Sequence, residues 1–313
     1  MTLTPAPLFN DLNLTLPTGG AYWTHAVDGV RLRLGAFQPE QAKGTVLMFP
    51  GRTEYLEKYL PTVNELARRG FATLVIDWRG QGLADRLLDD ARIGHVGLFA
   101  DYQKDVAALR TAAKELDLPR PFYLLGHSMG GCIGLRSLYE GLDVAAAAFT
   151  GPMWGIRIKP HLRPVAWALG HMMPVLGRGH HLPPGTVIDS YILTAPFEEN
   201  TLTSDPKMFD MMRSQLRAHP ELALGGPSFV WLREALTETL ALAGMPAPDI
   251  QSDAFLGSNE RIVHVGRIET RMRGWQNGHL HVIPGGEHEV LMEGKDVRQH
   301  IFDTIAERFA RAA

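Results

Sequence analysis

The sequence has one cysteine, Cys132, among 313 residues, which excludes an internal disulfide and favours a reducing compartment. Its 31 basic and 34 acidic side chains nearly cancel, so the strongly basic surface that nucleic-acid binding needs is excluded. No apolar run approaches the about 20 residues of a membrane-spanning helix, and residues 1–10 lack the pattern of a signal peptide. These absences favour a cytoplasmic protein and are compatible with peripheral contact at the inner membrane surface.

The chain has enough apolar residues to bury a large core, with 45% in the hydrophobic set and 21% charged. Continuous apolar runs of strand length occupy residues 45–49 and 71–76, and helical spacing covers residues 55–70 and 99–116. Unalternated strands separated by helices are typical of a parallel sheet covered on both faces. The sequence therefore predicts an α/β fold with a mostly parallel, doubly wound sheet. Alternation over residues 30–34 predicts one half-exposed strand.

This rhythm of strands and helices stops after residue 150. Residues 154–242 are rich in prolines, aromatics and methionines, with loosely helical apolar groups and no convincing strand. The pattern resumes near residue 254, continues to a strand at 279–283 and closes with an amphipathic helix. We therefore expect a core of residues 1–153 and 243–313, interrupted by a helical cap of residues 154–242.

Residues 126–131, with the sequence Gly-His-Ser-Met-Gly-Gly, contain the pattern G-x-S-x-G. An apolar run precedes them and a small-residue segment follows, which is the strand, turn and helix context of a nucleophile elbow. A sharp, strained turn would hold the hydroxyl of Ser128 clear of the sheet. Gly126 and Gly130 stand where a Cβ atom would collide with neighbouring backbone. Ser128 is therefore the candidate nucleophile.

A serine hydroxyl near neutral pH needs a base to accept its proton, and the base needs an acid to orient it. Where the serine stands on such an elbow, the chain order is serine, acid, histidine. His288 follows the predicted strand at residues 279–283, in the glycine-rich loop 284–289. Its position and the glycine-rich loop distinguish it from the other histidines among the 13 of the chain. We expect His288 to be the general base.

The acid is expected at the end of the preceding strand, where Glu260 stands just before an apolar pair. Asp249, Asp253 and Glu287 are the alternatives. Asp253 is expected inside the strand rather than after it, and Glu287 is too close in sequence to His288 to reach its far ring nitrogen. Glu260 is therefore the predicted acid of the triad.

Ester or amide cleavage also requires two backbone N–H groups aimed at the developing oxyanion. One is expected from Met129, directly after the nucleophile. The other is expected from the loop after the strand at residues 45–49, where a Pro-Gly pair lets the backbone approach the substrate. Arg52, which follows that pair, is the predicted second donor.

Several motifs together resemble bacterial lysophospholipases of the monoacylglycerol lipase branch of the α/β-hydrolases. The resemblance implies an α/β-hydrolase fold, a serine triad, a helical cap and hydrolysis of esters of single-chain glycerolipids, without metal or organic cofactor. Two positions depart from it: many relatives have His-Gly where this chain has Pro-Gly, and many use Asp where Glu260 stands. The motifs are residues 49–55 with Lys58 and Tyr59, residues 77–82, the elbow at 126–131, and, within the cap, residues 200–206 and 225–227 with Trp231.

The cap combines apolar and basic residues. Trp154, Trp167 and Met172 are expected to contact the acyl chain of a lipid or other ester substrate, although a plain cap core would explain the same apolar residues. Basic side chains in the same segment are expected to attract a phosphate head group or an anionic bilayer. They are Arg157, Lys159, Arg163 and Arg178.

Other interpretations of the sequence stay open. A proline-specific serine aminopeptidase would share the fold and triad and would need an acidic anchor, which Glu198 and Glu199 could supply. A catalytically silent binding protein would share the fold alone. Acyl transfer would need only an alcohol in place of water. His279 and His281 alternate on one strand as in some metal sites, but a strand-surface pair is expected because no further ligands accompany them. We expect no metal site, and the sequence does not indicate the oligomeric state.

Overall fold

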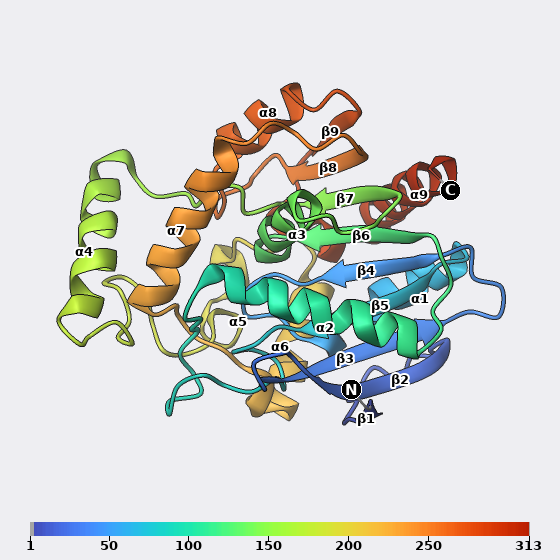
Figure 1. Ribbon diagram of the computed structural model, residues 1–313, viewed down its shortest axis with the longest axis horizontal. Coiled ribbons are helices and arrows are strands. Elements are labelled where there is room, and N and C mark those ends of the chain that lie inside the picture. Colours follow the sequence, from blue (N-terminus) through green and yellow to red (C-terminus); the bar gives the residue numbers. More distant parts are fainter. Residues whose placement is uncertain (1–2, 313) are drawn as a thin grey trace.

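The computed structural model describes residues 3–312, and within them the strands form one nine-stranded sheet (Figure 1). The strand order is β1-β2-β3-β5-β4-β6-β7-β8-β9. The first strands pair antiparallel up to β5, and every pair from β5–β4 to β8–β9 is parallel. Their bounds are β1 (Thr4–Pro5), β2 (Thr18–His25), β3 (Arg31–Gln38), β4 (Thr45–Phe49), β5 (Ala72–Asp77), β6 (Phe122–His127), β7 (Ala146–Thr150), β8 (Gln251–Gly257) and β9 (Gly278–Ile283).

Helices cover both faces of the sheet, and successive residues of a buried strand contribute to opposite cores. Leu47 of β4 packs in one apolar cluster with α2 (Tyr102–Glu115), α3 (Met129–Tyr139) and α8 (Val265–Arg273). The adjacent Val46 and Met48 pack in the other cluster with α1 (Leu60–Arg68) and α9 (Lys295–Arg311). Figure 1 shows α2 and α3 in front of the strands. The predicted α/β fold with a mostly parallel, doubly wound sheet is thus confirmed.

One local prediction was wrong at the N-terminal side of the sheet. The strand near residues 30–34 is buried on both faces, because the charged Arg33 forms buried ion pairs with Glu57 and Asp77 at 2.7 Å each. The helix expected over residues 55–70 is confirmed, with the 3-10 turn η1 (Leu56–Tyr59) as its start and α1 as its continuation.

Between β7 and β8 the chain forms helices, in the segment expected to be a cap. They are α4 (Arg163–Val175), α5 (Tyr191–Thr194), α6 (Pro206–Ala218) and α7 (Phe229–Ala243), with the 3-10 turns η3 (Pro160–Leu162), η4 (Phe197–Glu199) and η5 (Pro220–Leu222). Figure 1 shows α4 standing away from the sheet, with α7 between α4 and the core. Trp231 of α7 and Phe209 of α6 enter the two core clusters, which anchors this segment on the sheet.

The remaining short elements are η2 (Phe99–Asp101), which leads into α2, and η6 (Val290–Met292), which precedes α9. No helix within residues 3–312 combines the length and the apolar character needed to cross a bilayer.

Candidate active site

Ser128 stands on a strained turn between β6 and α3. Its backbone has φ of +49° and ψ of −116°, a conformation that side-chain-bearing residues rarely adopt. The neighbouring glycines make the turn possible. A Cβ atom on Gly130 would lie 1.9 Å from the carbonyl oxygen of Phe49, and one on Gly126 would lie 3.0 Å from that of Gly130. The local sequence thus forces the Ser128 side chain out at the end of β6 and against the loop after β4.

Ser128, His288 and Glu260 lie in one hydrogen-bonded row, as expected from the sequence. Nε2 of His288 lies 2.9 Å from Oγ of Ser128, and its Nδ1 lies 2.6 Å from Oε2 of Glu260. All three residues are buried or nearly so. With Glu260 accepting at Nδ1, that nitrogen carries the proton, and Nε2 is free to accept the proton of the serine hydroxyl.

The carboxylate of Glu260 is held in its ionised form. Its Oε1 accepts hydrogen bonds from the backbone N–H groups of Ile262 at 2.6 Å and Val263 at 3.0 Å. Burial opposes ionisation, but these donors and His288 outweigh it and lower the pKa of Glu260 below its ordinary value. A charged acid at this place orients the imidazole and stabilises it once it is protonated.

The alternative acids are engaged elsewhere. Asp253 lies within β8, as expected, and pairs with Arg308 at 2.7 Å and with Nε2 of His281 at 2.9 Å. Glu287 pairs with Arg261 at 2.8 Å. The buried carboxylate of Asp253 in β8 is therefore explained by its ion pair to α9, and His281 binds the same carboxylate.

The two backbone N–H groups expected to face an oxyanion are both available. Met129 opens α3, so its N–H is one of the donors that a helix start leaves without an intrahelical acceptor. In the described part of the chain, the backbone N–H groups of Met129 and Arg52 donate to no protein acceptor. The N–H of Gly51, by contrast, donates to the carboxylate of Glu54. Side chains of residues 77–82 fix this loop: Trp78 donates to the carbonyl of Pro50 at 3.0 Å, and Gln81 to that of Gly51 at 2.7 Å.

A buried ionic cluster, consisting of Glu54, Lys58 and Glu289, lies under the same loop. Nζ of Lys58 is 2.5 Å from Oε1 of Glu54 and 2.6 Å from Oε2 of Glu289, the residue after His288. Burial opposes the ionisation of Glu54, but Lys58 and the other donors lower its pKa to about 2. In the sequence, Glu54 and Lys58 stand out only as parts of a motif, with no predicted role. Their four-residue spacing was the available signal.

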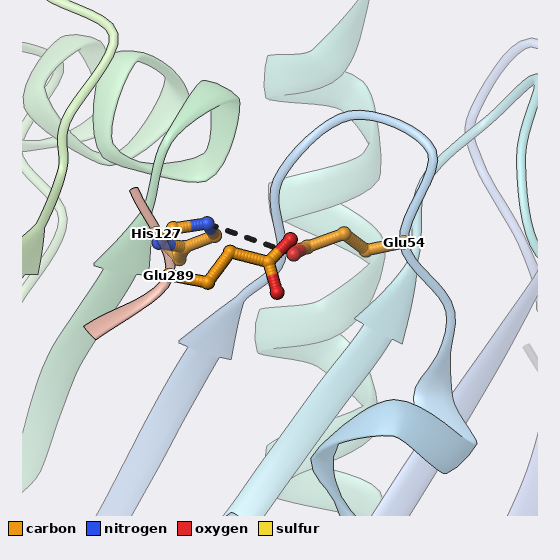
Figure 2. A group of neighbouring side chains, drawn as sticks. All are labelled: Glu54, His127 and Glu289. Carbon is orange, nitrogen blue, oxygen red and sulfur yellow. Dashed lines mark ion pairs between the residues drawn. The ribbon is translucent and has the colours of Figure 1, made fainter. Parts of the chain in front are cut away.

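One potential metal-ligand atom from each of Glu54, His127 and Glu289 lies within 4.8 Å of the other two, as ligand atoms around a metal ion do (Figure 2). The chemistry of the group argues for a different cation. The ammonium of Lys58 already pairs with both carboxylates, and burial lowers the pKa of His127 to about 3, which keeps this ring neutral. The fixed charge of Lys58 therefore fills the place that a metal would take.

A cavity of about 680 Å³ opens over Ser128 and His288. This volume is within the usual range of small-molecule sites, and most of the wall is apolar. The apolar wall comes from the chain before α4, from α4 itself, from the start of α7 and from the loop after β8. Its main members are Ile156, Ile158, Leu162, Val165, Leu169, Phe229, Leu232 and Ile262.

The three aromatic and methionine residues expected to contact substrate do not line this cavity, so that expectation is corrected. Trp154 is a core residue, since its Nε1 donates to the carbonyl of Gly131 at 3.1 Å and its ring stacks on Trp275. Trp167 faces a separate small hollow toward α7, and Met172 is half exposed on α4. Helical spacing alone could not tell which face of α4 turns toward the cavity.

The charged residues of the cap also lie outside the cavity wall. Arg157, Lys159 and Arg178 are exposed on the surface, and Arg163 is partly buried beside Trp167. Glu198 and Glu199 are both exposed.

Comparison with known proteins extends over almost the whole chain. Residues 40–295 match the family described as serine aminopeptidase, S33. The chain is 31% identical over 301 residues to lysophospholipase L2 of Escherichia coli strain K12, covering 91% of this chain and 86% of that protein. It is 28% identical over 272 residues to a probable lysophospholipase L2 of Haemophilus influenzae, covering 86% and 84%.

Solved structures share the fold. A soluble variant of monoglyceride lipase from Saccharomyces cerevisiae, in complex with a substrate analog, aligns with a TM-score of 0.74 at 18% identity, covering 98% of this chain and 99% of that one. A thermostable carboxyl esterase from Bacillus coagulans, in complex with glycerol, aligns with a TM-score of 0.71 at 15% identity, covering 92% and 97%.

Proposed function

The chain belongs to the serine aminopeptidase S33 family of α/β-hydrolases, and from this premise we propose that it hydrolyses carboxylic esters of single-chain glycerolipids, namely lysophospholipids or monoacylglycerols. The observation that carries the proposal is the hydrogen-bonded row of Ser128, His288 and Glu260 at the floor of a large apolar cavity. The names of the relatives in E. coli and H. influenzae support the same substrate class.

The reaction follows from the geometry. Ser128 attacks the acyl carbonyl while Nε2 of His288 takes the hydroxyl proton. Glu260 holds the imidazole and stabilises its charged form. The N–H groups of Met129 and Arg52 bind the oxyanion of the tetrahedral intermediate. Collapse of this intermediate forms the acyl-enzyme as the glycerol oxygen leaves with the proton of His288. Water then attacks, with His288 again as base, and releases the fatty acid.

The apolar wall of the cavity suits an acyl chain. Each methylene group that leaves water contributes about 0.8 kcal/mol, so a long chain gains far more here than a short one. No cofactor enters any step. Acyl transfer would use the same acyl-enzyme with an alcohol in place of water, so it remains an alternative outcome of the same chemistry.

An aminopeptidase function is less well supported, although the family is named for one. Binding a free amino terminus needs a carboxylate in the cavity that is not already paired. Glu54 and Glu289 line the cavity, but both pair with Lys58. Glu198 and Glu199, the anchors considered from the sequence, are exposed outside its wall. A silent binding protein would have no need of the ordered row at Ser128.

The outer face of the cap suits peripheral contact with the inner surface of a membrane. Val175, at the end of α4, and Leu176, which follows it, expose 86% and 62% of their surface. Arg178 follows these two residues and Lys159 precedes the other end of α4; both are exposed and would be attracted to anionic lipids at about 1 kcal/mol each. We propose that the protein works in the cytoplasm and meets its lipid substrates by this face.

A substrate panel tests the proposal. Purified protein is assayed on monoacylglycerols, lysophospholipids, a water-soluble butyrate ester and proline amides. We expect turnover of the single-chain lipids well above that of butyrate, and none of the amides. Preferential cleavage of proline amides would overturn the proposal in favour of the peptidase.

A further inference from the structure

Arg52 contributes a second feature to the cavity besides its backbone N–H. Arg52 lines the cavity, and its guanidinium lies beside Trp231, another wall residue, with Cζ 5.4 Å from the ring centroid. Nη1 donates to the carbonyl of Gly225 at 2.8 Å, in the turn before α7. In residues 3–312 this is the one hydrogen bond of the side chain, and no carboxylate pairs with it. A guanidinium has five N–H donors, so most of them point to no protein acceptor.

Arg52 has fewer partners than several other buried or half-buried cations of this protein. Arg33 and Arg79 each pair with two carboxylates. Arg86 has no carboxylate but donates to several backbone carbonyls. Lys58, the other cation of the cavity wall, pairs with two carboxylates. Among these groups, Arg52 alone has neither a carboxylate partner nor more than one acceptor in the described residues. Burial lowers its pKa to about 10, so the group is still charged at neutral pH.

A half-buried charge with no opposite charge beside it is costly, and a guanidinium matches phosphate oxygens with paired hydrogen bonds. The position of the group also agrees with a phosphate ligand. Its backbone N–H is the predicted donor to the ester oxyanion, and the guanidinium lies one arginine side chain from that N–H. In a lysophospholipid the glycerol unit places the phosphate at a similar span from the ester carbonyl. A monoacylglycerol has no charged group at that point.

We propose that the Arg52 guanidinium is a phosphate subsite, which binds the phosphodiester of a lysophospholipid and makes the enzyme prefer that substrate to a monoacylglycerol. The inference rests on the proposed function and makes it more specific. Arg52 then acts twice on one substrate, through its N–H at the carbonyl and through its side chain at the head group.

The test compares Arg52→Gln and Arg52→Lys with wild type on two lipids that share the oleoyl chain, lysophosphatidylethanolamine and monooleoylglycerol, in the same detergent micelles. The measured quantity is the ratio of kcat/KM for the two lipids, because a disturbance of the oxyanion loop lowers both values together. We expect Arg52→Gln to lower the ratio about 10- to 100-fold, and Arg52→Lys to recover part of it. Arg110→Gln removes an exposed charge on α2 and is expected to leave the ratio unchanged. An unchanged ratio in Arg52→Gln would overturn the inference.

A binding measurement tests the subsite without turnover. Glycerophosphoethanolamine, which carries the phosphodiester and no acyl chain, is titrated into wild type and Arg52→Gln by calorimetry, with inorganic phosphate as the comparison. We expect the phosphodiester to bind wild type more tightly than inorganic phosphate does, and to lose about 10-fold or more in the variant. Equal binding to both proteins, or tighter binding of inorganic phosphate, would overturn the inference. If wild type bound the phosphodiester through Arg52 but cleaved neither lipid, the subsite would stand and the proposed function would fail.

Discussion

Nζ of Lys58 lies 2.6 Å from Oε2 of Glu289, the residue that follows His288. The same ammonium pairs with Glu54, whose carboxylate also accepts from the N–H of Gly51. One buried lysine therefore ties the loop of the proposed base to the loop of the proposed oxyanion donor. The two loops follow different strands and are far apart in the sequence. The pairing through Lys58 therefore fixes the positions of these two parts of the site relative to each other.

Removal of Lys58 should be costly. Lys58→Met would leave two buried carboxylates without their cation, and breaking a buried pair in this way costs about 3–5 kcal/mol. The free energy of unfolding by urea measures the loss. Arg68→Gln breaks an exposed pair with Glu65 and should cost about 0–1 kcal/mol. Similar small losses in both variants would mean that the cluster contributes little to the fold.

Acid should destabilise the protein through Glu54. Burial opposes its ionisation, but Lys58 and the other donors lower its pKa from an ordinary 4.5 to about 2 in the folded state. The folded pKa is below that of the unfolded chain, so this stabilisation is complete above a pH of about 4.5 and is lost as the pH falls toward 2. Unfolding free energies between pH 6 and 3 should therefore fall less steeply for Glu54→Gln than for wild type. Parallel curves would contradict this origin of acid sensitivity.

The two buried acids near β8 should respond differently to neutralisation. Glu260→Gln should keep the fold and lower kcat by orders of magnitude, because the imidazole loses its orienting acceptor and its charge stabilisation. Asp253→Asn breaks the pairs with Arg308 and His281, so it should lower the melting temperature and leave kcat nearly unchanged. Steady-state kinetics and thermal melts of both variants decide the matter. A large fall in kcat for Asp253→Asn with a small one for Glu260→Gln would reassign the acid.

The apolar face beside α4 should govern lipid-surface activity. Val175→Asp with Leu176→Asp places charges on two exposed apolar positions. Binding to anionic vesicles and turnover of vesicle-borne lysophospholipid should fall several-fold, while turnover of soluble butyrate should not change. Val27→Asp, an equally exposed position on the core, is the matched control. Unchanged vesicle binding in the double variant would show that this face stays in solvent and does not contact the lipid surface.

The row at Ser128 is predictable from the sequence because each of its members follows a strand of the parallel part of the sheet. Carboxyl ends of parallel strands meet at one edge of a sheet, so the assignment of strands alone places Ser128, Glu260 and His288 at the same edge. The second acid, Asp253, is set apart by the same reasoning, since it falls inside β8.

The cavity wall could not be predicted in this way. Trp154 and Trp167 belong to a segment whose helical periodicity marks an apolar face without saying what covers it. Trp154 lies outside the cavity because it packs on Trp275. Trp167 lies outside it because its side chain faces the hollow beside α7. The pairing of Lys58 with Glu289 joins residues far apart in sequence, and charged residues are ordinarily expected at the surface.

Labelling by a fluorophosphonate, combined with ester turnover in Ser128→Ala, tests the proposed nucleophile most directly. We expect wild type to be labelled covalently at Ser128. The variant, folded as judged by its melting curve, should lose the label and nearly all turnover of lysophospholipid and monoacylglycerol, with only the residual rate that the oxyanion donors and binding supply. Persistent labelling or near wild-type turnover in the folded variant would contradict the proposed mechanism, because the nucleophile would then lie elsewhere.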